Sequence, residues 1–177
     1  EIVGDIPRGS TISKVVQSKN SDYKENDLVV MESGMQSYAV SDGTGVVRAI
    51  TGNAPITTAL GILGMPGLTA YSALMGPACL NSEDRIIVSA ASGAVGSMVG
   101  QIASIKGAIA IGIAGSDEKC EWAISDAKMK SCLNRKTQNL DELIGEALPN
   151  GADIFFDNTG GDIQKLILSK HIAINSR

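Results

Sequence analysis

The chain has 177 residues, of which 44% are hydrophobic and 19% charged, the composition of a globular segment that can bury a substantial core. Its net charge of −4 lacks the excess of Lys and Arg that a nucleic-acid backbone requires, and no run approaches 18 apolar residues. Neither nucleic acid nor a membrane is therefore an expected partner. Three scattered cysteines and one histidine form no metal-binding pattern, so we expect no metal site. The cysteines also favour a reducing compartment, which predicts a cytoplasmic protein.

The first part of the chain, residues 1–76, has the pattern of a small and partial β-rich domain. Short β-rich runs alternate with turn residues. The expected strands are Ile12–Gln17, Asp27–Met31, Ser37–Val40 and Val46–Ile50. Two short connecting helices are expected after them, at 55–60 and 68–75, joined by residues 64–67.

The second part, residues 77–177, alternates short apolar runs with helical patterns. The expected buried strands are Arg85–Ala90, Ile109–Ala114, Ser131–Leu133 and Asp153–Asp157. Apolar residues recur at helical spacing after residue 94 and again after Asn139, which is expected to cap the later helix. This alternation predicts an α/β fold with a doubly wound, Rossmann-type parallel sheet.

A glycine-rich turn, with Gly93, Ala94, Val95 and Gly96, directly follows the first of these strands. We expect Gly93 to allow a sharp turn, Gly96 to allow close approach to a diphosphate, and Gly100 to allow close packing of the helix on the strand. Free N–H groups of the first helical turn would then face the anion. The alternative is a packing turn that binds nothing.

The end of the second strand indicates which dinucleotide this turn would bind. NAD sites usually place a carboxylate at this strand end, whereas here Gly115 and Ser116 occupy the tip and Lys119 follows. A cation in the first helical turn is unfavourable towards the helix dipole, so a bound 2′-phosphate would explain Lys119. Arg135 follows the third strand and would add a second positive group. These residues favour NADP(H) over NAD(H) as the cofactor. The alternative is that Lys119 and Arg135 are solvated surface charges that bind no phosphate.

Doubly wound sheets bind ligands where the strand order reverses, which is expected between the first and fourth strands. Asn158 follows the fourth strand and would therefore lie beside the cofactor, although an Asn cap of a strand-to-helix turn is the alternative. Tyr38 and Tyr71 are candidates for the substrate pocket or for packing. We expect His171 to be exposed to solvent and the cysteines to be small core residues.

Four motifs in this order resemble the zinc-independent medium-chain dehydrogenase/reductases of the prostaglandin reductase and plant alkenal (double-bond) reductase type. The motifs are LGMPGLTAY at 63–71, AASGAVG at 90–96, GSDEK at 115–119 and FDNTGG at 156–161. The segment SYAVSDG at 37–43 is similar to the end of that family's GroES-like catalytic domain. The resemblance implies a partial catalytic domain at 1–76 and an incomplete NADP-binding Rossmann domain at 77–177.

The resemblance also implies an activity, namely NADPH-dependent reduction of the carbon–carbon double bond of α,β-unsaturated aldehydes and ketones. Hydride would pass to the β-carbon. Residues 93–96 would hold the diphosphate, Lys119 the 2′-phosphate and Asn158 the cofactor near its nicotinamide half. Thr69 and Tyr71 would line the nicotinamide and substrate pocket. The family usually has a tyrosine where this chain has Arg135, which keeps a phosphate donor at that position.

Members of this family are about twice as long, so the chain is expected to be a fragment. The family's tyrosine near the substrate carbonyl would lie beyond Arg177, which leaves the catalytic residues and the proton donor unassigned in this chain. The expected partners are a small enone or enal substrate and a second copy in a homodimer. Two alternatives remain: an NADPH quinone oxidoreductase with the same glycine turn, and a non-catalytic Rossmann protein that only binds NADP(H).

Overall fold

The chain forms two compact units, Glu1–Met65 and Pro66–Arg177, in the computed structural model, which describes residues 3–49, 52–137 and 139–177. The sequence predicted the boundary between its two parts after residue 76. In the structure helix α1 (Met65–Met75) packs with the second unit, because Ala70 and Leu74 are fully buried in that unit's core.

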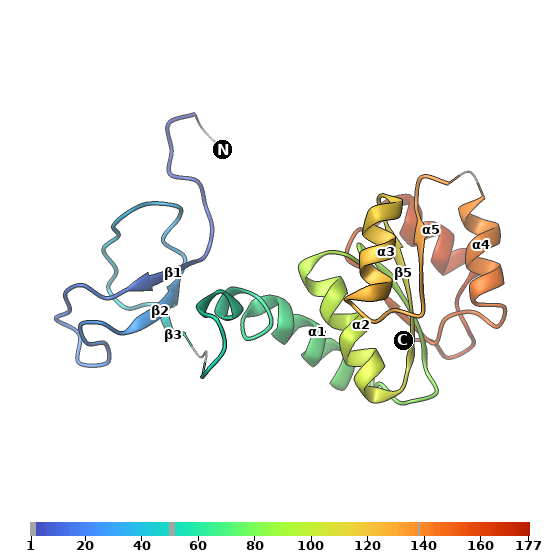
Figure 1. Ribbon diagram of the computed structural model, residues 1–177, viewed down its shortest axis with the longest axis horizontal. Coiled ribbons are helices and arrows are strands. Elements are labelled where there is room, and N and C mark those ends of the chain that lie inside the picture. Colours follow the sequence, from blue (N-terminus) through green and yellow to red (C-terminus); the bar gives the residue numbers. More distant parts are fainter. Residues whose placement is uncertain (1–2, 50–51, 138) are drawn as a thin grey trace. The chain divides into compact units, whose positions relative to one another are not determined.

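The first unit contains a three-stranded antiparallel sheet in the order β1-β2-β3 (Figure 1). Its elements are β1 (Thr11–Lys14), β2 (Leu28–Met31), β3 (Val47–Arg48) and the 3-10 helix η1 (Ile56–Leu60). The register pairs Thr11 with Met31 and Val29 with Arg48. Among the described residues of this unit, the buried hydrophobic ones are Val29 and Ala59.

Two of the strands expected in the first unit differ in the structure. The strand expected at Ser37–Val40 is wrong: these residues form an exposed loop in which the relative exposure of Tyr38 is 79%. The strand expected at Val46–Ile50 is reduced to β3, and Ile50 lies outside the described residues. The β-rich composition of residues 37–40 is not sufficient to form a strand. A strand also requires a neighbouring strand to pair with, and this segment pairs with none of β1, β2 and β3.

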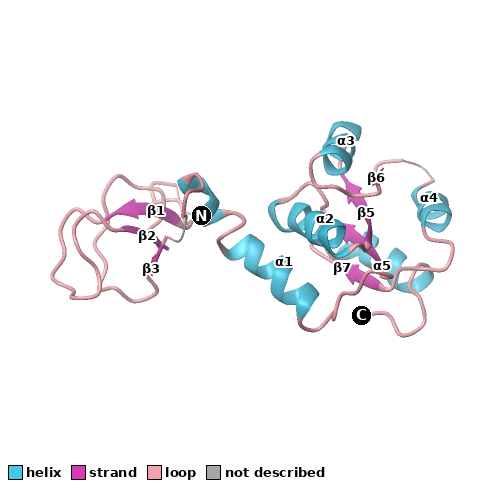
Figure 2. Ribbon diagram, turned by 60° about the horizontal axis from the view of Figure 1, so that its bottom comes forward, coloured by secondary structure: helices cyan, strands magenta, loops and turns pink. Residues whose placement is uncertain are grey.

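The second unit is built on a four-stranded parallel sheet in the order β6-β5-β4-β7 (Figure 2). Its strands are β4 (Arg85–Ser89), β5 (Ile109–Ala114), β6 (Ser131–Asn134) and β7 (Ile154–Phe156). The helices that alternate with them are α2 (Ala94–Lys106), α3 (Asp117–Ser125), α4 (Leu140–Ala147) and α5 (Gly161–Lys170). This confirms the predicted fold class, a doubly wound parallel sheet preceded by a small β-rich unit.

Helices cover both faces of this sheet, which explains the continuous apolar runs of its strands. Ile86 and Val88 of β4 belong to a core with α1, α2 and α3, whereas Ile87 between them belongs to a second core with α4 and α5. Figure 1 shows the same division, with α2 and α3 on one side of β5 and α4 and α5 on the other. Successive side chains of a strand point to opposite faces of the sheet. Because helices cover both faces, successive residues of β4 can all be apolar and buried.

The helix ends follow local sequence signals in part. Helix α2 ends at Gly107, which has a φ of +81° and donates its N–H to Ser104 O. The predicted cap at Ser116 of α3 is confirmed, whereas the Asn139 side chain makes no capping hydrogen bond to α4. Asn139 Oδ1 instead accepts a hydrogen bond from Thr137 Oγ1. Helix α1 begins at Met65, earlier than predicted, because Pro66 is tolerated in a first helical turn.

The strand order reverses between β4 and β7, since the chain moves from β4 through β5 to β6 and then returns to pair β7 with β4. Helix α2 leaves β4 towards one face and helix α5 leaves β7 towards the other. The carboxyl ends of β4 and β7 therefore form the topological switch point, where doubly wound sheets bind their ligands.

Candidate functional site

The turn between β4 and α2 lies at this switch point. Ala91 N donates to Ile113 O at the end of β5 over 3.0 Å, and Gly93 N donates to Ala90 O over 2.9 Å. The turn is therefore fixed both to the neighbouring strand and to itself. Ala91 is fully buried beneath the turn, whereas Gly93 is exposed above it.

The start of α2 offers backbone donors to an anion. The hydrogen bond from Ser97 N to Gly93 O, over 2.9 Å, is the first of the helix, and the N–H groups of residues 94–96 precede it. Such N–H groups, together with the helix dipole, favour a negatively charged group above the helix start. Because Gly93 and Ala94 are exposed, this side of the turn is accessible to a ligand.

The structure changes the reasons expected for Gly93 and Gly100 and adds a packing reason for Gly96, whose approach to a diphosphate stays a prediction. The positive φ, +48°, belongs to Ala90, while Gly93 has a φ of −77° that any residue adopts. A Cβ on Gly96 would lie 2.4 Å from Ala90 O, so Gly96 is needed for packing α2 on the turn itself. A Cβ on Gly100 would lie 2.4 Å from Ala127 O, so that glycine packs against the segment before β6 instead of the strand β4.

The tip of β5 brings Gly115, Lys119 and Arg135 to the same edge of the sheet. Ser116 caps α3 by accepting a hydrogen bond from Lys119 N over 3.4 Å. Arg135 N donates to Ala114 O over 2.9 Å, and Arg135 Nε lies 3.6 Å from the place of a Cβ on Gly115. The guanidinium group of Arg135 thus lies over the tip of β5, beside the first turn of α3.

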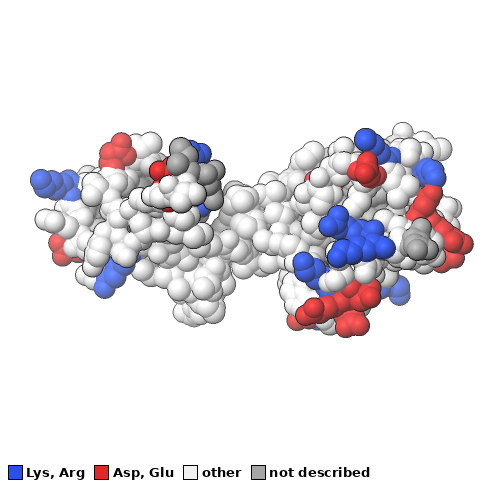
Figure 3. Space-filling view, turned by 90° about the horizontal axis from the view of Figure 1, so that it is seen from above, with Lys and Arg blue, Asp and Glu red and all other residues white. Residues whose placement is uncertain are grey.

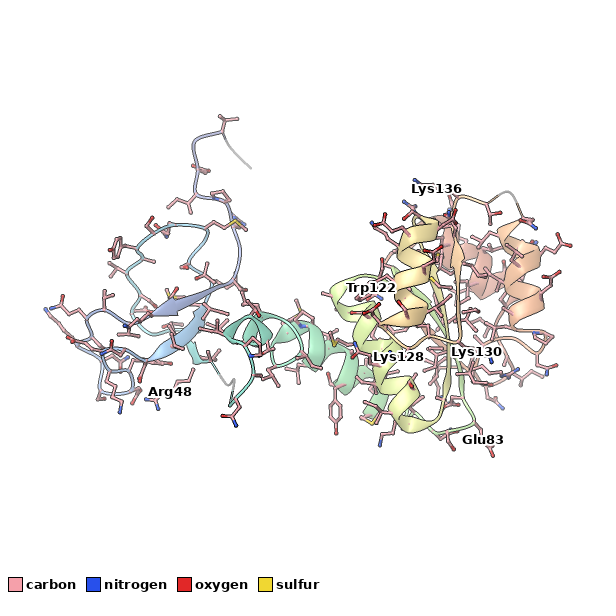
Figure 4. All side chains as sticks on the ribbon, viewed as in Figure 1. Arg48, Glu83, Trp122, Lys128, Lys130 and Lys136 are labelled. Atoms are coloured by element: carbon pink, nitrogen blue, oxygen red, sulfur yellow. The ribbon has the colours of Figure 1, made fainter. Side chains whose placement is uncertain are left out.

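The basic groups at this edge are free to meet an anion. Lys119 and Arg135 are exposed, and neither forms a salt bridge with any residue that the structure describes. The neighbouring acid, Asp117, accepts a hydrogen bond from Asn134 Nδ2 over 2.8 Å. Figure 4 labels Lys136 at this end of the unit, and Figure 3, seen from above, shows basic side chains gathered beside acidic ones there.

The loop after β7 is joined to the end of β4 by side-chain hydrogen bonds. Ser89 Oγ donates to Asp157 Oδ1 over 2.7 Å and accepts from Asn158 N over 2.7 Å. Asn158 Nδ2 donates to Ser89 O over 2.9 Å. The amide of Asn158 is therefore held at the switch point in a defined orientation, although its side chain is exposed.

Asp157 is the centre of this loop. Burial raises the pKa of its carboxyl, but hydrogen bonds from Thr159 N, Ser89 Oγ and Gly160 N outweigh burial and hold the pKa below its ordinary value. The donors from the loop lie at 3.0 Å for Thr159 N and 3.1 Å for Gly160 N. An ionised carboxylate therefore fixes the backbone of residues 157–160.

The three pocket candidates lie on two different units. Thr69 and Tyr71 are exposed on α1 of the second unit, on which Ala70 and Leu74 form the buried side. Tyr38 belongs to the first unit, where it lines an open cavity of about 560 Å³ together with Glu32 and other polar residues. Their predicted contact with a nicotinamide or a substrate stays a prediction.

The sequence did not identify Ser89 and Asp157 as parts of this site. Asp157 carries a local signal, since an Asp followed by Asn-Thr-Gly-Gly is typical of a turn in which the carboxylate accepts backbone N–H groups. Ser89 carries no such signal. Its partners lie 68 and 69 positions away in the chain, so only the pairing of β4 with β7 brings them together.

Two predictions on other residues are corrected. His171, expected at the surface, is buried at 7% relative exposure, because the end of α5 lies against α4 and places His171 Nε2 at 2.8 Å from Asp141 Oδ1. Cys79, expected in the core, is exposed. Cys120 is buried next to Cys132, and burial followed by the contact with Cys120 raises the pKa of the Cys132 thiol.

The described parts of the chain contain neither a metal-binding cluster nor a membrane-spanning helix. Residues 3–49, 52–137 and 139–177 bring no three His, Cys, Asp or Glu side chains together in a group suited to a metal ion. Within the same ranges, no helix has the length and apolar character needed to cross a bilayer.

Comparison with known proteins gives related sequences along nearly the whole chain. A family model described as the N-terminal domain of oxidoreductase matches residues 2–49. Prostaglandin reductase 1 of Bos taurus is 39% identical over 171 residues, which are 94% of this chain and 52% of that protein. The NADPH-dependent curcumin reductase of Escherichia coli (strain K12) is 36% identical over 166 residues, 94% of this chain and 48% of that protein.

A solved structure agrees with these sequence relatives. CurA from Vibrio vulnificus in complex with NADPH matches with a TM-score of 0.87 and 35% identity, covering 96% of this chain and 50% of that one. The chain spans about half the length of the curated relatives it matches. These matches in sequence and fold confirm the predicted resemblance to the prostaglandin reductase type, over the half of those proteins that the chain spans.

Proposed function

We propose that this chain holds NADP(H) for an oxidoreductase that reduces the carbon–carbon double bond of α,β-unsaturated aldehydes and ketones. The observation that carries the proposal is the convergence of three features at one edge of the parallel sheet. They are the turn at 90–96, the exposed pair Lys119 and Arg135 at the tip of β5, and Asn158 held beside β4. Prostaglandin and curcumin reductases among the relatives, and NADPH in the matched CurA structure, support it.

The chemistry of the donors fits a dinucleotide that carries an additional phosphate. N–H groups of residues 94–96 would bind the diphosphate, and Gly115 would leave room beside the adenosine ribose. Lys119 and Arg135 would bind the 2′-phosphate, because they are cations without an acidic partner among the described residues. Asn158 would contact the half of the cofactor that carries the nicotinamide.

When bound, NADPH supplies a hydride for the β-carbon of the substrate. Charge that develops on the substrate carbonyl oxygen requires hydrogen-bond donors placed in advance. The cofactor would be bound and oriented by the turn at 90–96 and by Gly115, Lys119, Arg135 and Asn158. Thr69 and Tyr71 are proposed to line the pocket for a small enone or enal, while a role of Tyr38 in substrate binding and a homodimer stay predictions.

The activity is tested by following NADPH oxidation with three acceptors: 4-hydroxy-2-nonenal, a simple cyclic enone and a quinone. Oxidation with the first two, together with a product saturated at the former double bond, is the expected result. Oxidation with the quinone alone would instead identify an NADPH quinone oxidoreductase. Tight NADPH binding without turnover of any acceptor would identify a non-catalytic NADP(H)-binding protein.

The assignment of the 2′-phosphate site is tested with Lys119→Ala and Arg135→Ala. Each variant loses a charge-assisted contact, so we expect the Kd for NADPH to rise about 10- to 100-fold, while the Kd for NADH changes by less than about twofold. Lys130→Ala is the matched control, because Lys130 is an exposed lysine before the start of β6, at the opposite end of that strand from Arg135. Equal losses for both nucleotides would show that Lys119 and Arg135 are ordinary surface charges.

A further inference from the structure

Ser89 is a buried polar residue for which the proposed function provides no contact. Its relative exposure is 0%, and it is the last residue of β4, directly before the turn at 90–96. A hydroxyl in such a position costs free energy unless hydrogen bonds satisfy it. Here the hydroxyl donates to Asp157 Oδ1 and accepts from Asn158 N, both over 2.7 Å, so all its bonds lead to the loop after β7.

The two loops at the switch point need such a connection. The backbone register between β4 and β7 ends at the pair Val88 and Phe156, one residue before Ser89 and Asp157. Beyond this pair the chain continues into α2 on one face and α5 on the other, so the two loops diverge. The side chains of Ser89 and Asp157 therefore continue the link between the strands where the backbone ladder stops.

Asp157 extends this link into its own loop. Its carboxylate accepts hydrogen bonds from Thr159 N and Gly160 N, and Gly160 has a φ of +63°, which favours glycine. The position of Asn158 between these residues is therefore determined by Ser89 on one side and Asp157 on the other. A nucleotide that contacts both the turn at 90–96 and Asn158 requires the distance between the two loops to be fixed.

We propose that Ser89 and Asp157 are positioning residues that hold Asn158 at a fixed place relative to the phosphate turn, so that both halves of one NADPH molecule are bound together. The inference rests on the proposed function, because it takes NADPH as the ligand of the switch point. It assigns to the pair no contact with the cofactor. Their removal should affect ligands that reach both loops and leave unaffected a ligand that does not extend to Asn158.

The test compares two nucleotides on the full chain. Ser89→Ala is expected to raise the Kd for NADPH about tenfold, measured by nicotinamide fluorescence. The Kd for adenosine 2′,5′-bisphosphate, measured by calorimetry, should change by less than about twofold, because this ligand lacks the nicotinamide half. Asp157→Asn should show the same division between the two ligands.

Matched controls separate positioning from a general loss of stability. Ser97→Ala removes another buried serine hydroxyl, at 3% relative exposure, whose hydrogen bond to Ala94 O stays within α2. Asp153→Asn removes the carboxylate that joins the amino ends of β4 and β7 through Arg85. Both controls should leave the Kd for NADPH within about twofold of the unsubstituted protein, even where they lower its melting temperature.

Three results would contradict these expectations in distinguishable ways. A loss of adenosine 2′,5′-bisphosphate binding as large as the loss of NADPH binding would overturn the positioning role. An equal rise of the Kd for NADPH in Ser97→Ala would do the same, since it would trace the effect to any buried serine. Failure of the unsubstituted protein to bind NADPH would overturn the proposed function itself, and this is seen before any variant is compared.

Discussion

Ala90 has a backbone conformation that is unusual for a residue with a Cβ. Its φ of +48° lies in the left-handed region, where an L-residue is destabilised relative to glycine. The chain tolerates it because Ala90 O accepts the hydrogen bond from Gly93 N and so closes the turn. Strain of this kind is frequent in turns next to binding sites, where the surrounding structure determines the backbone.

Ala90→Gly should therefore stabilise the protein. Relief of the left-handed strain outweighs the larger entropy of glycine in the unfolded chain, and we expect the free energy of unfolding to rise by about 0.5–1 kcal/mol. Urea denaturation measures the change. The same substitution at Ala147, in the last turn of α4, is the control and should lower the free energy by about 0.5–1 kcal/mol. A destabilising effect at Ala90 would show that its φ is not strained.

Gly96→Ala should have a large opposite effect. The new Cβ would lie 2.4 Å from Ala90 O and 3.0 Å from Ala91 Cα, and both neighbours are backbone atoms that cannot move aside without shifting the turn. We expect a loss of about 2–3 kcal/mol in the free energy of unfolding. Gly115→Ala is the matched control, since its Cβ would meet Arg135 Nε at 3.6 Å, an ordinary contact. Comparable losses in both variants would contradict the packing role given to Gly96.

Among the elements, β4 and β7 are joined at both of their ends. At the amino ends Arg85 Nε and Nη2 donate to the two carboxylate oxygens of Asp153, each over 2.8 Å, and at the carboxyl ends Ser89 donates to Asp157. Such bidentate pairs are among the stronger side-chain interactions. The strand pair that forms the switch point is thus fixed by side chains as well as by its backbone ladder.

This arrangement predicts a dependence of stability on pH. The hydrogen bonds from Arg85 hold the pKa of Asp153 below its ordinary value of 3.8, and the pKa of Asp157 is also lowered. A carboxyl with a depressed pKa in the folded state stabilises the protein fully above its unfolded pKa, and this contribution is lost as the pH falls through the folded pKa. The free energy of unfolding should therefore decrease progressively below about pH 5.

Denaturation at a series of pH values measures this decrease. Asp153→Asn should lower the free energy of unfolding near pH 7 and make it less dependent on pH in the acidic range, because one of the two groups is removed. Asp162→Asn is the control: its ion pair with Lys165 is highly exposed, at 101% and 80% side-chain exposure, and should contribute little. An unchanged acid dependence in Asp153→Asn would exclude the Arg85 pair as its source.

For the whole molecule, the two units differ in how much apolar surface they bury. The second unit has two cores, one on each face of its sheet, whereas Val29 and Ala59 are the buried hydrophobic residues among those described in the first. All the residues proposed to hold the dinucleotide, at 93–96, 115–119, 135 and 158, belong to the second unit. Binding of NADPH should therefore stabilise this unit directly.

Hydrogen exchange with and without NADPH measures this effect. A ligand that binds the folded state at 100 times its Kd stabilises that state by about 2.7 kcal/mol. We expect new protection at residues 90–97, 115–119 and 157–160. Protection concentrated instead at residues 31–46, around the cavity of the first unit, would contradict the placement of the nucleotide site.

Much of the second unit follows from local patterns in the chain. The expected strand Ile109–Ala114 matches β5, and α2 begins directly after the glycine-rich turn, because apolar runs and glycines there reflect burial on both faces of a sheet. Less of the first unit follows, since the loop at 37–40 has a strand-like composition without a partner strand. Strand formation depends on such partners, which a local pattern does not contain.

The sequence by itself determined the fold class, the turn at 90–96 and the basic residues that follow β5 and β6, because each is encoded by neighbours in the chain. Only the tertiary structure decided that Arg135 lies over Gly115, that His171 is buried against Asp141, and that Ser89 binds Asp157 and Asn158. These contacts join residues 20 or more positions apart, and they exist because the parallel strands place the ends of distant segments side by side.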